Sequence, residues 1–216
     1  MSDLNEQRKS LPIGPGGHAD FYRMTILPLE TEKLDRLRAA ILKWQVISAE
    51  EFEHFRQRSE GQPASPMADY GYDPVGDEAF MLGQTERVMW ASFAVAIASA
   101  VERLFGSICG TLELKLPAKP NWGQKKGAIE NKLGIDFASL DGFSGATLAR
   151  LLGNDFKHNS CTVGSEFSSY SGRQIGLEIE YEKEQWEAIL CDAISFMCAL
   201  VNRLDSLPTP QPEGGA

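Results

Sequence analysis

The sequence predicts an all-α protein: an antiparallel four-helix bundle with a small β-hairpin before the last helix and an N-terminal helical hairpin extension. Residues 78–109 have the pattern of one long helix that is apolar nearly all round in its middle, as a central core helix should be. Residues 183–205 carry apolar side chains at alternating steps of four and three, the seam of a bundle helix. That seam consists of Trp186, Leu190, Ala193, Met197, Leu200 and Leu204. The only strand-like alternation lies within 162–181, which predicts the hairpin.

The first 60 residues are predicted to hold a polar tail and a helical hairpin. Residues 1–20 are polar and rich in Gly and Pro. Apolar residues at helical spacing begin a first helix near Thr31. Ser48 and Glu51 have the spacing of a capping box, which predicts a second helix over about 49–58.

The domain organisation follows from the loop signals. The stretch 59–77 holds three prolines and three glycines, so residues 61–77 are predicted to be a loop. It separates the N-terminal region, 1–60, from a helical bundle over 78–206. Residues 207–216 are expected to form a disordered tail.

Two shorter helices are predicted inside the bundle. A connector with Pro117 and Pro120 leads to a helix over 122–133. A glycine-containing loop then precedes a helix over 144–158.

Composition and charge exclude several classes of protein. The 216 residues carry a net charge of −9, so the chain is a poor general binder of nucleic acid unless its basic residues cluster. No apolar leader follows the polar start, and the longest uncharged apolar stretch, 88–101, is shorter than the roughly 20 residues that span a bilayer. The four cysteines form no C-x-x-C pair. We therefore expect a reduced, cytoplasmic protein that makes no membrane contact.

Most enzyme signatures are absent from the sequence. It has no phosphate-binding loop, no dinucleotide fingerprint and no H-E-x-x-H motif. The three histidines, at positions 18, 54 and 158, are scattered. We therefore expect neither a metal nor a cofactor.

One helical segment, Leu148 to Asn159, combines a buried stripe with a polar face. At about 100° per residue, Leu148, Leu152 and Phe156 share the apolar side. The residues of the contiguous polar face are Arg150, Asn154, Lys157 and His158. An in-line attack on an RNA phosphate uses such groups, because imidazole acts as a general acid or base while a cation stabilises the charged phosphorane. These four residues are the candidate catalytic set.

A basic stretch is the candidate RNA-binding segment. Residues 115–132 hold five lysines and one glutamate, a net charge of +4 within an acidic protein. Lys125 and Lys126 could contact phosphates, and Trp122 could stack on a base. A solvated lysine face is the alternative explanation of this stretch.

The polar-face segment and its setting over 80–205 resemble the HEPN superfamily of helical-bundle proteins, many of which are prokaryotic ribonuclease toxins, defence factors or RNA-processing proteins. The functional mark of the family is an arginine, usually followed by a polar residue, with a histidine further along the helix. Asn154 and His158 match the polar residue and the histidine. Gly153 stands at the arginine position, and Arg150 is the nearest arginine.

The resemblance implies a metal-independent endoribonuclease or RNA-binding protein of a bacterial or phage defence or toxin-type system. It also implies a homodimer in which two His158 faces approach each other, and Ile189 and Phe196 widen the apolar face of the last helix in a way that favours such pairing. Gly153 favours an alternative, a non-enzymatic helical interaction protein such as an immunity or regulatory partner.

The polar face also has a purely structural explanation. Lys157 and His158 stand near a helix end, where cationic side chains satisfy terminal carbonyls. Position 153 borders the polar face on the helical wheel, so an arginine placed there is expected to reach solvent.

Overall fold

The computed structural model describes residues 17–60, 71, 73–159 and 161–206. Within these residues the chain is all-α, and its only β pairing is an isolated bridge. The tail predicted over 207–216 lies outside the described residues, as do most of the N-terminal tail and most of the predicted loop.

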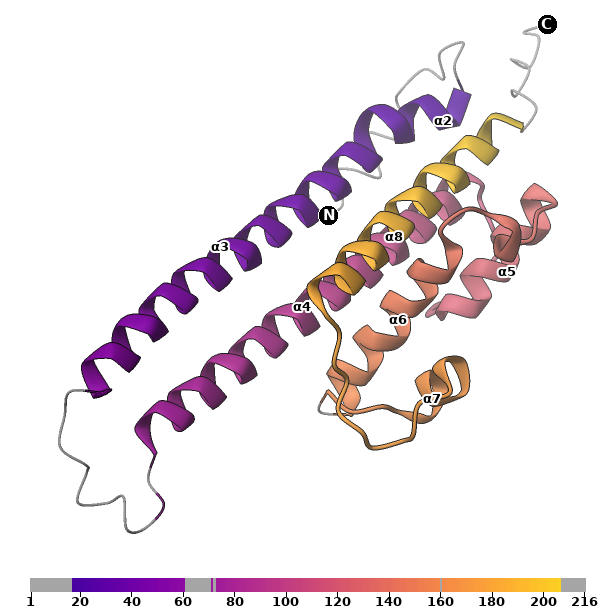
Figure 1. The fold of residues 1–216 in the computed structure, drawn as a ribbon. Coiled ribbons are helices and arrows are strands. Elements are labelled where there is room, and N and C mark those ends of the chain that lie inside the picture. The colour runs from indigo at the N-terminus through magenta and orange to yellow at the C-terminus, as the bar shows by residue number, and fades with distance from the viewer. Residues whose placement is uncertain (1–16, 61–70, 72, 160, 207–216) are drawn as a thin grey trace, which may run out of the picture.

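Five helices make up most of the fold (Figure 1). They are α3 (Leu27–Glu60), α4 (Pro74–Thr111), α5 (Trp122–Leu133), α6 (Phe143–His158) and α8 (Lys183–Arg203). The shorter elements are α2 (Gly17–Phe21), a π-helical turn (Tyr22–Ile26), α7 (Ser165–Ser171) and two 3₁₀ turns (Phe137–Ser139, Leu204–Ser206).

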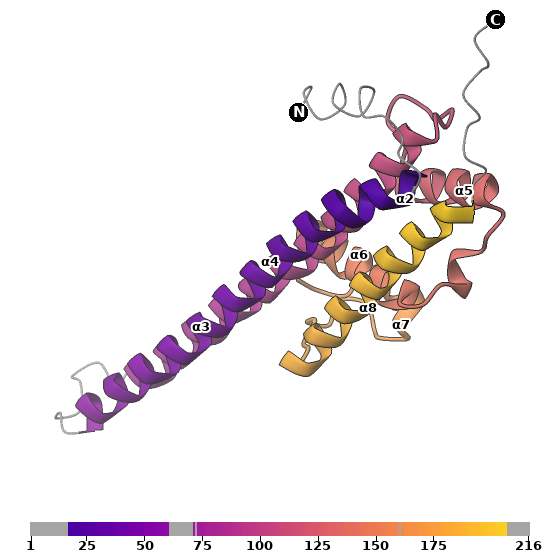
Figure 2. The same ribbon diagram turned by 90° about the horizontal axis from the view of Figure 1, so that it is seen from above.

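Helix α4 is the centre of the arrangement, because it contacts α3, α5, α6 and α8. Figures 1 and 2 show α3 and α4 side by side, extending together beyond α6 and α8. We call this projecting part the arm: residues 46–60 of α3 with 73–88 at the start of α4. Helix α5 lies toward the other end of the molecule from the arm (Figure 2).

An aromatic core joins the helices. Phe196 of α8 lies with its ring centroid 6.0 Å from that of Phe105, 5.3 Å from that of Phe137 and 5.2 Å from that of Phe143. Nearer the arm, the rings of Trp90 and Trp186 are stacked 5.8 Å apart. Burying such large side chains supplies most of the driving force for packing the helices together.

The helices predicted over 78–206 are confirmed. Helix α5 has the predicted bounds, since the Asn121 side chain caps it and forms a capping box with Gln124. Helix α6 begins one residue earlier than predicted. All six seam residues predicted for the last helix are buried, five of them in α8 and Leu204 in the 3₁₀ turn that follows it. Helix α4 starts four residues earlier than predicted, because Asp73 caps it and Pro74 occupies its first turn.

The predicted N-terminal helical hairpin is wrong. A single helix, α3, runs from Leu27 to Glu60, and its antiparallel neighbour is α4. Ser48 does not begin a helix: its hydroxyl donates to the carbonyl of Gln45, 3.1 Å away, inside a continuous helix. The spacing of a capping box therefore occurs here without a helix boundary.

The predicted β-hairpin is also absent from the described residues. A helix, α7, occupies Ser165–Ser171, and the only pairing is the antiparallel bridge between Thr162 and Glu178. The alternation suggested a strand with one buried face, but Ile175 and Leu177 are exposed. Gly172, with φ of 71°, ends α7 in the left-handed conformation, so the Ser-rich stretch closes as a helix.

The two residues that favoured dimerisation through α8 point into the chain's own core. Ile189 and Phe196 are both buried, and Phe196 belongs to the aromatic core. They offer no apolar surface to a second copy.

Candidate functional site

Arg150, the nominated phosphate-binding cation, is held by two neighbours within the chain. Its guanidinium pairs with the carboxylate of Glu166 on α7 and lies 5.7 Å from the centroid of the Trp122 ring on α5. The Arg150 side chain is 18% exposed, and its Nε is buried without a hydrogen-bond partner among the described residues. Arg150 thus connects α5, α6 and α7. Sequence reasoning missed Glu166, because nothing in the spacing of the two residues indicates their contact.

Lys157 and His158 are placed differently. Both lie in the last turn of α6 and are exposed, and their side chains make no hydrogen bond or ion pair with any described residue. Asn154 is half-buried one turn earlier. Arg150 and His158 are about 12 Å apart along the helix axis, so the structure does not bring the four nominated residues together at one point.

A buried carboxylate that the sequence did not single out organises the end of α6. Asp155 is 5% exposed and accepts hydrogen bonds from the backbone N–H of Gly164 and from the side-chain amide of Asn159, each at 2.8 Å. Because both donors lie beyond α6, this carboxylate fixes the path of the chain between α6 and α7. Its role is structural.

Gly153 lies against α4 and not at the border of the polar face, so that expectation is wrong. It is buried, and a Cβ atom at position 153 would lie 3.4 Å from the Cα of Val95 and 3.6 Å from the Cβ of Ala98. An arginine there would run into the backbone of α4. The helical wheel took the buried side of α6 to be the stripe of Leu148, Leu152 and Phe156. Both α4 and α8 pack on α6, so its buried surface is wider than that stripe and includes Gly153.

The candidate RNA-binding residues are only partly available. Lys126 pairs with Glu130 at 2.6 Å, and its ammonium lies 5.6 Å from the centroid of the Phe143 ring. The centroid of the Trp122 ring lies 4.7 Å from that of Phe105, and the Arg150 guanidinium lies over the same ring. Trp122 is therefore part of the internal packing. Lys125 makes no ion pair with any described residue and is half-buried.

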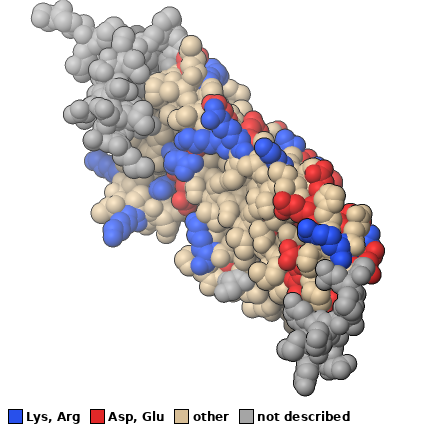
Figure 3. All heavy atoms as spheres, turned by 90° about the vertical axis from the view of Figure 1, so that its left-hand side faces the viewer, with Lys and Arg blue, Asp and Glu red and all other residues tan. Residues whose placement is uncertain are grey.

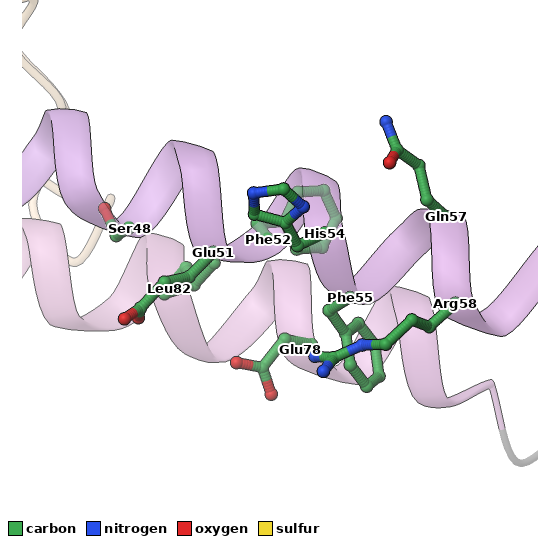
Figure 4. A pocket seen from close by; sticks show the side chains of 9 residues that line it. All are labelled: Ser48, Glu51, Phe52, His54, Phe55, Gln57, Arg58, Glu78 and Leu82. Atoms are coloured by element: carbon green, nitrogen blue, oxygen red, sulfur yellow. The ribbon is translucent and has the colours of Figure 1, made fainter.

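A groove of about 720 Å³ lies in the arm between α3 and α4, far from the α6 face. It is lined by Ser48, Glu51, Phe52, His54, Phe55, Gln57, Arg58, Glu78 and Leu82. Figure 4 shows Arg58 reaching back past Phe55 toward Glu78 of the opposite helix. The groove combines an apolar floor with charged residues of both signs, and sequence reasoning missed it because it depends on how two distant segments pair.

The described residues hold no cluster of three or more histidine, cysteine, aspartate or glutamate side chains that could bind a metal ion. Burial raises the pKa of the Cys109 and Cys198 thiols. A raised pKa favours the neutral thiol, the form in which a buried cysteine packs as a small apolar group.

Helix α4 is, by length and composition, apolar enough to cross a membrane. Within its most apolar window, with a mean hydropathy of 1.5, 56% of the residues are buried inside the chain. A central core helix has the same properties.

Comparison of the chain with known family models, curated proteins and solved structures found no match.

Proposed function

We propose that the chain is a non-enzymatic helical interaction protein, an immunity or regulatory partner, on an antiparallel four-helix bundle of the HEPN type. The observation that carries the proposal is the placement of Arg150. Its guanidinium is occupied by Glu166 and Trp122, about two turns from His158. A ribonuclease of this kind needs a cation beside its imidazole to stabilise the phosphorane.

The environment of Gly153 supports the same proposal. At the position where the HEPN family carries its arginine, this chain has a buried glycine that faces α4, where an added Cβ would lie 3.4 Å from the Cα of Val95. Replacing an arginine by glycine there exchanges a catalytic cation for a helix–helix contact. Such an exchange is compatible with keeping the fold while losing the chemistry.

A second candidate function is a HEPN-like RNA-acting protein of a bacterial or phage defence or toxin-type system. One observation favours it: the side chains of Lys157 and His158 are exposed and free of partners among the described residues. In this alternative His158 is the general acid or base, and Lys157 takes the place of Arg150 as the cation.

The proposal places the protein in the cytoplasm, away from the membrane. Its support is that more than half of the apolar window of α4 is covered by the chain itself.

An RNA cleavage assay separates the two functions. Purified protein is incubated with bulk RNA without divalent metal, beside the variants His158→Ala and Lys157→Ala. Both substitutions are at exposed positions and leave the fold intact, which circular dichroism checks. The proposal expects that wild type cleaves no more RNA than His158→Ala. Cleavage by wild type that His158→Ala removes would refute it in favour of the RNA-acting function.

A further inference from the structure

The outer face of α3, opposite its contact with α4, carries two adjacent exposed apolar residues. Val46 is 59% exposed and Ile47 is 42% exposed, whereas Ile41 on the other side of the helix is buried. By helical phase, Lys43 and Glu50 share the outer face with them, Lys43 about one turn before the apolar pair and Glu50 about one turn after.

Lys43 and Glu50 differ from most other charged residues of α3. Both are exposed, and neither forms an ion pair with a described residue. By contrast, Arg36 pairs with Glu32 along the same helix. Figure 3, which faces this side of the molecule, shows basic groups mainly toward the end away from the arm and acidic groups gathered toward the arm.

We propose that this face binds a second copy of the chain, with the two α3 helices antiparallel about a two-fold axis that passes between Val46 and Ile47. In this register Val46 lies opposite Ile47 of the second copy, and Lys43 lies opposite its Glu50. The two-fold axis repeats each contact, so one apolar centre is flanked by two ion pairs. We call this face, with its four residues, the α3 patch.

The charges along the rest of the helix agree with that register. Along the helix axis, Lys33 comes level with Glu60 of the second copy and Asp35 with Arg58, while within one copy Lys33 pairs with Glu30 and Glu60 with Arg56. From 33 to 60, no charged residue comes level with one of the same sign. Charge complementarity of this kind selects one register and one direction, because a parallel pairing would place Lys43 on Lys43 and Glu50 on Glu50.

The second copy has room to approach. Residues 46–60 of α3 belong to the arm, which projects beyond α6 and α8 (Figures 1 and 2). A single pair of crossing helices buries less area than a standard interface, so we expect a dissociation constant in the range of about 1–100 µM. The dimer does not depend on the proposed function, since the α3 patch includes no residue of the α6 polar face.

Charge exchange tests the register directly. Sedimentation velocity of the full chain measures the dissociation constant for wild type, for Lys43→Glu and for Glu50→Lys. Each variant places like charges opposite each other twice, so each is expected to weaken the dimer at least about tenfold. An equimolar mixture of the two variants restores both ion pairs, and its association is expected to return to within a few-fold of wild type.

Two further variants separate the patch from general apolar association. Ile47→Asp is expected to abolish the dimer, while Ile175→Asp, at an exposed apolar position in the segment that follows α7, is expected to leave it unchanged. The inference is overturned if wild type is monomeric at about 200 µM, a concentration above the upper end of the expected range of dissociation constants. A dimer that the single charge variants leave intact, or that their mixture fails to restore, also overturns it.

Discussion

The contact between Gly153 and α4 predicts opposite effects for small and large substitutions. A Cβ at position 153 would lie 3.4 Å from the Cα of Val95, an ordinary van der Waals distance, so Gly153→Ala fits. Alanine in a helix interior is favoured over glycine by about 0.8–1.0 kcal/mol. At about 2–4 °C per kcal/mol for a chain of this size, the melting temperature of Gly153→Ala is expected to rise by a few degrees.

Side chains that extend beyond Cβ meet the backbone of α4. Gly153→Leu and Gly153→Arg are therefore expected to lose about 1–3 kcal/mol through overpacking, despite their better helix propensity. Gly106 of α4 is the matched control: it is exposed, and a Cβ there meets no atom within 4 Å, so Gly106→Leu is expected to be at least as stable as wild type. Differential scanning calorimetry measures all four variants. If Gly153→Leu melts as high as Gly153→Ala, Gly153 is not a close contact and the reasoning fails.

Two other variants test buried charged groups. Asp155→Ala leaves the N–H of Gly164 without its acceptor, so urea unfolding is expected to show that the free energy of unfolding falls by about 1–3 kcal/mol. The control Asp141→Ala, at an exposed position, is expected to change it very little. Equal effects of the two substitutions would contradict the assigned role of Asp155. Burial alone would raise the pKa of Glu30, but Arg103 and Lys33 bring that pKa below its ordinary value of 4.5. The free energy of unfolding of wild type minus that of Glu30→Gln is therefore expected to be constant above pH 4.5. It is expected to shrink as the pH falls through the lower pKa of the folded state. A difference that grows in acid would contradict the ion pairs.

The helices that sequence reasoning located well are those whose ends carry local signals. Asn121 and Gln124 begin α5 through their own side chains, and the seam of α8 is continuous over its whole length. The N-terminal hairpin failed for the opposite reason. Ser48 and Glu51 have the local spacing of a cap, but the buried contact of α3 with α4 continues through Ser48. Tertiary packing decided that boundary.

The candidate site shows the same limit. Helical periodicity correctly placed Lys157 and His158 at the exposed end of α6. It could not indicate that Arg150 would meet Glu166 and Trp122, which come from two other helices. Whether an arginine is free to bind phosphate depends on such long-range contacts, and a single sequence does not encode them in any local pattern.

The central claim is that Arg150 serves the fold and is not available to a ligand. Modification with phenylglyoxal, followed by peptide mass spectrometry, measures the reactivity of each arginine in the native protein. Arg58 is exposed and forms no ion pair with a described residue, so it sets the reactivity of a free guanidinium. We predict that Arg150 reacts much more slowly than Arg58 and that Glu166→Gln brings the two rates closer together. Arg150 reacting as fast as Arg58 in the wild-type protein would contradict the claim.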